Sequence, residues 1–206
     1  MNRHERRVAA KRQKKGAAGV HHGAMPSDPT ASSLTAAVAF HQAGELDRAE
    51  AIYRDILARA PSNADALHLL GVVLTQHGRA EDALPLLRRA ITAGGERPAF
   101  LSSLGIAHRG LGEHEAAIGA YRRAIAADSE HAESWINLGN SLAETDMPEE
   151  AAEAYERGLA IKPGSANGWT ALGSTRLILG KTEDALSAFD RALSIDPDHV
   201  DAMRRL

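Results

Sequence analysis

The chain has 206 residues, of which 44% are apolar and only 4% aromatic, and it contains no cysteine. The absence of cysteine excludes a disulfide framework, a thiolate nucleophile and a Cys-ligated zinc. No run approaches the roughly 18 apolar residues of a membrane span, and no apolar stretch follows the N-terminal charges. We therefore expect a cytoplasmic protein. Because Ala dominates the apolar residues, close-packed helices are favoured over a sheet.

Residues 1–29 are expected to form a basic, disordered N-terminal tail. Seven Lys and Arg stand against one Glu in residues 1–15, a local charge of +6, which leaves −9 for the rest of a chain whose total is −3. The second half of the segment is rich in Gly, Ala and Pro and has no apolar period. Two interpretations stay open: a solvated tail, which is favoured, and an arm that touches nucleic acid or acidic lipid. His21–His22 has no neighbouring ligands and is not expected to bind a metal.

From Thr30 a block of 34 residues repeats five times without insertion, at 30–63, 64–97, 98–131, 132–165 and 166–199. Position 8 is Gly or Ala, position 20 is always Ala, and position 24 is Tyr, Phe or Leu. The small residues predict two antiparallel helices in close contact. The large side chain at position 24 is expected to fill the space between one helix pair and the next. Residues 200–206 restart the block and predict a sixth repeat or a capping helix.

The ends of the predicted helices follow the same period. Position 15 is expected to end the first helix in a left-handed conformation, with Asp146 in the fourth block and glycine in the others (Gly44, Gly78, Gly112, Gly180). Acidic residues begin the second helix and arginines occupy its later turns, which complements the helix dipole. Glu50 with Arg54 and Glu153 with Arg157 are predicted ion pairs. Because acids interleave the arginines, we interpret this side as a solvated outer face.

These columns resemble the tetratricopeptide repeat, W-x2-LG-x2-Y with small residues at positions 8 and 20, an aromatic at 24 and Pro at 32. Residues 132–165 match it most fully, through Trp135, Leu138, Gly139 and Tyr155. The resemblance covers residues 30–199. It implies an all-α fold, a right-handed superhelical solenoid of antiparallel helix pairs whose first helices line a concave groove. The first block departs most from the pattern, as expected of a terminal cap.

In such arrays, positions 2, 5, 6, 9, 12 and 13 of each first helix project into the groove. The resemblance therefore implies a peptide-binding groove that includes the following residues: His41, Gln42, His68, Val72, Gln76, Ser102, Ile106, Arg109, Glu133, Ile136, Asn137, Asn140, Asn167, Thr170 and Ser174. This mixture of amide, hydroxyl, imidazole and small apolar groups suits an extended peptide. The carboxylate clamp of chaperone-binding relatives is absent. The asparagine ladder of O-GlcNAc transferase-type arrays is matched at Asn137 alone.

The sequence predicts no catalytic or metal site, because its Ser and His residues fall at positions set by the repeat. We expect no cofactor and no small-molecule substrate. The expected partner is a protein or peptide. Nucleic acid is not expected at the repeats because their net charge is negative, although binding through residues 3–15 stays a separate hypothesis.

Two hypotheses about function remain. The first is an interaction scaffold that binds an extended peptide or a partner helix in the concave groove. The alternative, which rests on resemblance, is a substrate-recruiting arm of a larger bacterial modifying enzyme of the glycosyltransferase or sulfotransferase kind. Under the first hypothesis, Asn137→Ala with Asn140→Ala weakens partner binding without changing thermal stability. Gly139→Leu should destabilise the fold by about 1 to 3 kcal/mol through overpacking.

Overall fold

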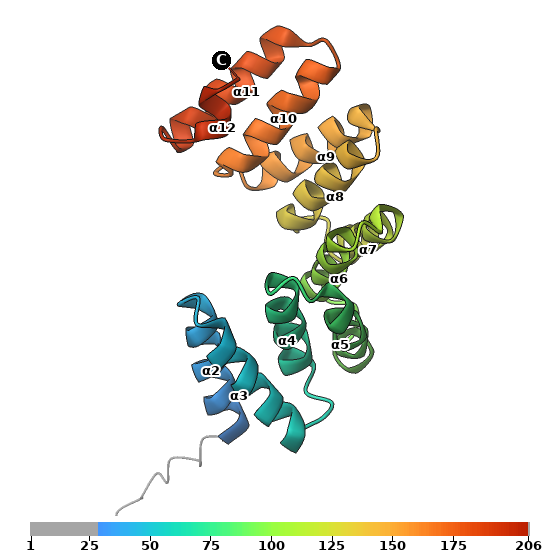
Figure 1. The fold of residues 1–206 in the computed structure, drawn as a ribbon. Coiled ribbons are helices and arrows are strands. Elements are labelled where there is room, and N and C mark those ends of the chain that lie inside the picture. The colour runs from blue at the N-terminus through green and yellow to red at the C-terminus, as the bar shows by residue number, and fades with distance from the viewer. Residues whose placement is uncertain (1–28, 206) are drawn as a thin grey trace, which may run out of the picture. The chain divides into compact units, whose positions relative to one another are not determined.

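The computed structural model describes residues 29–205, and in this range the chain is helical and has no strand (Figure 1). Residues 33–206 form one compact unit, which is the part considered below. The basic segment of residues 1–28, His21–His22 and Leu206 lie outside the described residues. The helices are α2 (Pro29–Gln42), α3 (Leu46–Arg59), α4 (Ala64–Gln76), α5 (Ala80–Gly94), α6 (Pro98–Gly110), α7 (His114–Ala127), α8 (Ala132–Glu144), α9 (Pro148–Ile161), α10 (Ala166–Ile178), α11 (Thr182–Ile195) and α12 (Val200–Met203).

These helices form antiparallel pairs that stack in chain order. Helix α4 packs on α5, α6 on α7, α8 on α9 and α10 on α11, and the second helix of each pair contacts the first helix of the next. The first helices α4, α6, α8 and α10 also contact one another in sequence. They therefore share one side of the unit, which we call the first-helix face. The architecture is the all-α solenoid of antiparallel helix pairs that the sequence predicts.

The core of each pair is built on small residues. The alanines at position 20 are all fully buried, and they are Ala49, Ala83, Ala117, Ala151 and Ala185. Since a methyl group is the only side chain at these points, the two helices approach closely and bury their apolar faces. No helix among the described residues is long and apolar enough to cross a membrane.

The glycines at position 8 make room for the large side chain at position 24 of the same pair. A Cβ atom at Gly139 would lie 2.7 Å from the ring of Tyr155. The same contact joins Gly71 with Leu87, Gly105 with Tyr121 and Gly173 with Phe189. The large side chain thus packs against the first helix of its own pair, a contact that the repeat pattern does not predict. In these four pairs glycine leaves the large side chain this space, whereas the first pair has Ala37 at position 8 opposite Tyr53.

Position 15 ends the first helices as predicted. Four glycines adopt φ values between 72° and 77°, and Asp146 is the one described non-glycine residue with positive φ, at 60°. A left-handed residue lets the chain reverse into the second helix within a few residues. Pro148 then opens α9, where the missing N–H has no helical acceptor to lose.

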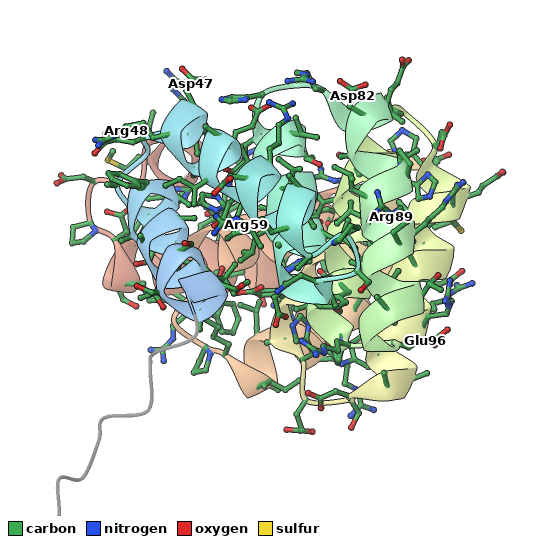
Figure 2. All side chains as sticks on the ribbon, turned by 90° about the horizontal axis from the view of Figure 1, so that it is seen from below. Asp47, Arg48, Arg59, Asp82, Arg89 and Glu96 are labelled. Carbon is green, nitrogen blue, oxygen red and sulfur yellow. The ribbon has the colours of Figure 1, made fainter. Side chains whose placement is uncertain are left out.

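Charged side chains are numerous on the second helices, and Figure 2 shows acids and bases interspersed along them, with Asp47, Arg48 and Arg59 on α3 and Asp82 and Arg89 on α5. The predicted pair of Glu50 with Arg54 is formed at 2.6 Å. The other predicted pair, Glu153 with Arg157, is absent from the ion pairs of the described residues. Both of these side chains are exposed, and an exposed pair gains too little to fix two flexible side chains.

Candidate functional site

Polar side chains of successive first helices are hydrogen-bonded to one another across the first-helix face. Each of these bonds joins two residues that are 35 positions apart in the sequence. They link Nε2 of His41 to Oε1 of Gln76 at 2.9 Å, Nε2 of His68 to Oγ of Ser103 at 2.8 Å, and Nη1 of Arg109 to Oε1 of Glu144 at 3.0 Å.

The spacing of 35 is the repeat length plus one residue, so neighbouring first helices lie in register with an offset of one. A residue at position 5 or 12 meets position 6 or 13 of the next helix. His41, Gln76, His68 and Arg109 belong to the groove set expected from the sequence, and their partners Ser103 and Glu144 also occupy groove positions, 6 and 13 of their blocks. The repeat pattern thus predicted the positions of these side chains, but not that they bond to one another.

The imidazole of His68 is the most perturbed titratable group on this face. Its ring packs on the ring of Phe100, with centroids 4.6 Å apart, and burial lowers the pKa of His68 to about 4, against an opposing effect of Asp65. Asp65 is itself bonded to Nη1 of Arg97 at 2.7 Å. His68 is therefore neutral near pH 7, and it can serve the face only as a neutral hydrogen-bonding group.

Arg109 stands at the centre of a charged cluster between α6 and α8. Glu144 accepts from Arg109 through Oε1, and its Oε2 lies 3.1 Å from Nδ1 of His114. Beneath this pair, Nε of Arg109 and the hydroxyl of Tyr121 are buried without a hydrogen bond among the described residues. Burial raises the pKa of Tyr121 to about 12, while the guanidinium of Arg109 acts in the opposite direction. The charges of Arg109 and Glu144 thus compensate each other within the protein.

The two asparagines of α8 differ in their environment. Oδ1 of Asn140 accepts a hydrogen bond of 2.8 Å from the hydroxyl of Tyr155, a ring that is 2% exposed. Asn140 therefore has a structural role, and we now expect its removal to cost stability, unlike the sequence-based prediction for the variant with Asn137→Ala and Asn140→Ala. Asn137, one turn earlier, is half-buried, and its amide makes no polar contact with any described residue.

Several other residues of the expected groove set are buried or make their contacts within their own helix pair. Ser102 and Thr170 are buried, and Oγ1 of Thr170 donates to the carbonyl of Ala166 in its own helix. Ser174 in turn donates to the carbonyl of Thr170. Ile136 packs against α9, because a Cβ at Gly158 would lie 2.7 Å from its Cγ1.

Two polar members of the set pair with residues near the ends of the repeats. Glu133 lies 3.7 Å from Nζ of Lys162, and Oδ1 of Asn167 bonds to Nε2 of His199 at 2.7 Å. The following members of the set are wholly or partly exposed to solvent. Ile106 is 36% exposed, Gln42 is exposed and Val72 is half-buried.

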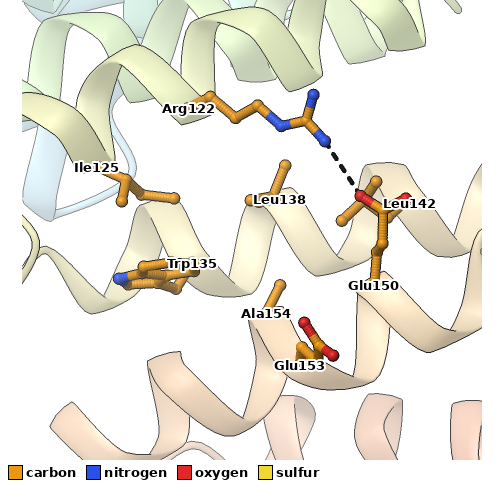
Figure 3. A pocket seen from close by; sticks show the side chains of 8 residues that line it. All are labelled: Arg122, Ile125, Trp135, Leu138, Leu142, Glu150, Glu153 and Ala154. Atoms are coloured by element: carbon orange, nitrogen blue, oxygen red, sulfur yellow. Dashed lines mark hydrogen bonds and ion pairs between the residues drawn. The ribbon is translucent and has the colours of Figure 1, made fainter.

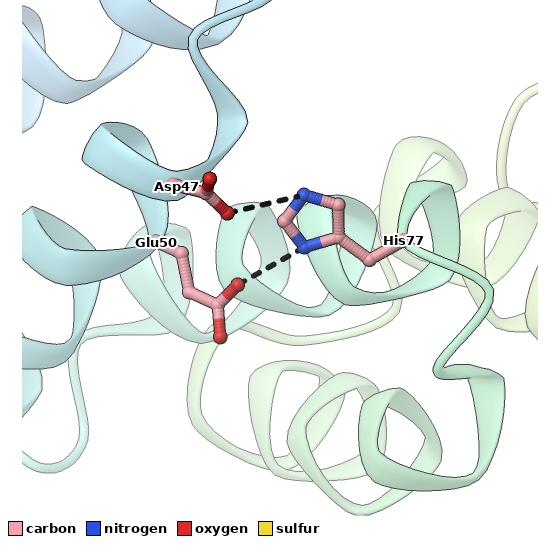
Figure 4. A group of neighbouring side chains, drawn as sticks. All are labelled: Asp47, Glu50 and His77. Carbon is pink, nitrogen blue, oxygen red and sulfur yellow. Dashed lines mark hydrogen bonds and ion pairs between the residues drawn. The ribbon is translucent and has the colours of Figure 1, made fainter.

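One group outside the first-helix face brings together residue types that bind metals. Asp47, Glu50 and His77 have oxygen and nitrogen atoms within 4.8 Å of one another (Figure 4). The two carboxylates, however, face different nitrogens of the ring: Glu50 lies 3.1 Å from Nδ1 and Asp47 lies 3.7 Å from Nε2. The carboxylate of Glu50 also forms ion pairs with Arg54 at 2.6 Å and with Arg79 at 3.0 Å. Two guanidinium groups would repel a cation, so this group is a network of ion pairs that ties α3 to the next helix pair.

The class of protein follows from the fold and from family models. A tetratricopeptide repeat model matches residues 34–98 and 103–166, and a second tetratricopeptide repeat model matches residues 166–199. The chain belongs to the tetratricopeptide repeat family.

Solved structures show the same fold. The crystal structure of MamA is 27% identical over 80% of this chain and 96% of its own, with a TM-score of 0.68. YrrB, described as a TPR protein with an unusual peptide-binding site, is 27% identical over 84% of this chain and 89% of its own, with a TM-score of 0.64. PilF of Pseudomonas aeruginosa shares the fold at 18% identity, with a TM-score of 0.78 over 85% and 80% of the two chains. No curated protein sequence matches the chain. Membership of this family identifies a protein-interaction scaffold.

Proposed function

We propose that this scaffold binds an extended peptide segment of a partner protein on the first-helix face, along α6 and α8. The observation that carries the proposal is Asn137. Its amide has no polar contact with any described residue, although it lies midway along a face where several polar side chains of neighbouring helices pair with one another. A side-chain amide can donate to and accept from the backbone of one extended residue at the same time, which is the recognition that a peptide needs.

The surroundings of Asn137 supply the rest of such a site. The offset of 35 residues sets Asn137 opposite the buried Ser102, so the accessible surface beside Asn137 continues with Ile106, one turn further along, and with the Arg109–Glu144 pair beyond it. From Asn137 to Glu144 the strip is about 10 Å long, which matches about three residues of extended peptide. Ile106 offers apolar surface midway, so a small apolar side chain of the peptide is favoured there.

The comparison with YrrB supports a peptide as the ligand, because that relative is described as having a peptide-binding site. The ends of the first-helix face are weaker candidates. His41 with Gln76 and Asn167 with His199 already satisfy each other. The alternative of a substrate-recruiting arm of a larger enzyme remains a hypothesis, and no contact among the described residues favours it.

The test is a peptide selection from a random library on the full chain, followed by affinity measurements on variants. Asn137→Ala should lower the affinity for the selected peptides by about tenfold, equivalent to about 1.4 kcal/mol. Asn167→Ala is the matched control, because it removes an amide that is bonded to His199 and lies outside the strip. Equal affinity of the Asn137→Ala variant and the unchanged chain would place peptide binding elsewhere.

A further inference from the structure

A second surface with the properties of an interaction site lies between the third and fourth helix pairs. A cleft of about 250 Å³ opens there, with no residue in common with the first-helix strip (Figure 3). Leu138, Leu142 and Ala154 line it and are each no more than 5% exposed, while Ile125 and Trp135 are half-buried. The cleft is therefore apolar inside.

Two positions of the repeat that line the cleft carry other residues elsewhere in the chain. In α5 the position of Ala154 is held by Leu86, which is half-buried and packs on the core. In α10 the position of Leu142 is held by Arg176, whose guanidinium reaches Glu156 at 2.9 Å and the carbonyl of Asp184 at 3.2 Å. Arg176 thus spans the corresponding space at the next junction. Here Leu142 holds that position, and the space that it lines together with Ala154 is the cleft.

The rim of the cleft is charged, and its charge is not balanced. Arg122 on one side pairs with Glu150 on the other at 3.1 Å, so these two charges are used. Glu153 also lines the cleft and is exposed, and its carboxylate has no ion pair or hydrogen bond with any described residue. It belongs to the acidic first half of α9, which contains Glu149, Glu150 and Glu153. The complementary group is a cation.

Trp135 gives the cleft its main apolar surface. The Nε1–H of the indole donates to the carbonyl of Ser129 at 2.9 Å, so the polar atom of the ring is satisfied within the protein. What the ring offers to the cleft is apolar area, and buried Trp side chains dominate many protein interfaces. The volume is below the roughly 300 Å³ at which small-molecule sites begin, and it suits a single large side chain.

We propose that this cleft docks a segment of a partner protein that inserts one large apolar side chain against Trp135 and sets a Lys or Arg beside Glu153. The site is independent of the peptide strip on the first-helix face. One partner can therefore occupy each surface.

The experiment uses the full chain with Trp169→Phe, which leaves Trp135 as the single tryptophan. Two synthetic amphipathic peptides serve as probes, one with Leu at helical spacing among Lys residues and one with Glu in place of each Lys. The Lys peptide should shift the emission of Trp135 to shorter wavelength in a saturable manner, and the Glu peptide should not. Equal responses to both peptides would overturn the proposal.

Variants then locate the binding. Ala154→Leu, which copies the residue of α5, should weaken the Lys peptide at least tenfold by filling the cleft. Glu153→Lys, an exposed change that cannot disturb packing, should weaken it several-fold, whereas Glu149→Gln removes an acid outside the lining and should leave affinity unchanged. If Glu153→Lys and Ala154→Leu both bind as the parent does, the cleft is not the site. If Asn137→Ala alone weakens the peptide, it binds at the first-helix face, and the cleft proposal fails while the proposed function stands.

Discussion

The hydroxyl of Tyr155 donates a hydrogen bond to Oδ1 of Asn140 at 2.8 Å, across the two helices of one pair. In the first pair Val38 stands at the position of Asn140, and the buried hydroxyl of Tyr53 has no hydrogen-bond partner among the described residues. A tyrosine at the same position of the repeat therefore has a hydrogen-bonded hydroxyl in the fourth pair and a buried hydroxyl without a partner in the first. Burial raises the pKa of both phenols.

We expect Asn140→Ala to lower the free energy of unfolding by about 1 to 3 kcal/mol, because it leaves the hydroxyl of Tyr155 buried without an acceptor. Urea unfolding followed by circular dichroism measures the change. Asn137→Ala is the control and should stay within about 0.5 kcal/mol of the parent, since no described residue bonds to that amide. Combining Asn140→Ala with Tyr155→Phe should cost less than the two single changes added together. Strict additivity would mean that the hydrogen bond contributes nothing.

Two glycines inside helices should respond in opposite ways to alanine. Gly139→Ala sets a Cβ 2.7 Å from the ring of Tyr155, so we expect a loss of about 1 to 3 kcal/mol from overpacking. Gly119 lies exposed in α7, and a Cβ there meets nothing within 4 Å. Gly119→Ala should therefore stabilise the protein by up to about 1 kcal/mol through helix propensity. Thermal melts of both variants provide the comparison, and a shift in the same direction for both would contradict the packing described.

Acidification should destabilise the protein through His68. Burial holds the pKa of this imidazole at about 4, whereas in the unfolded chain it titrates near its ordinary value of 6.5. Between these two values the unfolded state binds the proton more readily, so the free energy of unfolding falls as the pH falls from 6.5 toward 4. Urea unfolding across this window should give a weaker pH dependence for His68→Gln than for the parent. Parallel curves would show that His68 is not buried in its neutral form.

The tyrosines should resist ionisation in the folded protein. The chain has three, and burial raises the pKa of each, that of Tyr121 to about 12. Absorbance at 295 nm should show less tyrosinate at pH 10 in the folded chain than in the chain unfolded by denaturant, in which all three phenols titrate near their ordinary value. Because the unfolded state loses these protons first, stability is full below pH 10 and is lost as the pH rises toward 12. A third of the signal appearing at pH 10 in the folded state would contradict the burial of one ring.

The helices could be predicted from the sequence because the repeat encodes them locally. Helices α4, α6, α8 and α10 begin at Ala64, Pro98, Ala132 and Ala166, where the 34-residue blocks begin. The left-handed glycines and Asp146 were predicted as well, since a tight reversal leaves few alternatives to positive φ.

The site was less predictable, because it depends on how one pair turns against the next. Positions carried over from the family put Ser102 and Thr170 in the groove, yet both are buried. The rotation of each first helix decides whether position 5 faces solvent or the neighbouring helix. A residue such as Asn140, which looks like a ligand contact in a single repeat, proves to be bonded to Tyr155 once the second helix is in place.

The hydrogen bonds between residues 35 apart bear on how long complexes with the first-helix face last. A partner that uses Arg109 must first displace Glu144, and exchanging one hydrogen bond for another yields little net free energy. If the proposed peptide binds here, polar contacts at these paired groups would select among partners without holding any of them tightly. Residence time would then depend on apolar surface such as that of Ile106 and on the unpaired amide of Asn137, which favours rapid turnover of partners over permanent assembly.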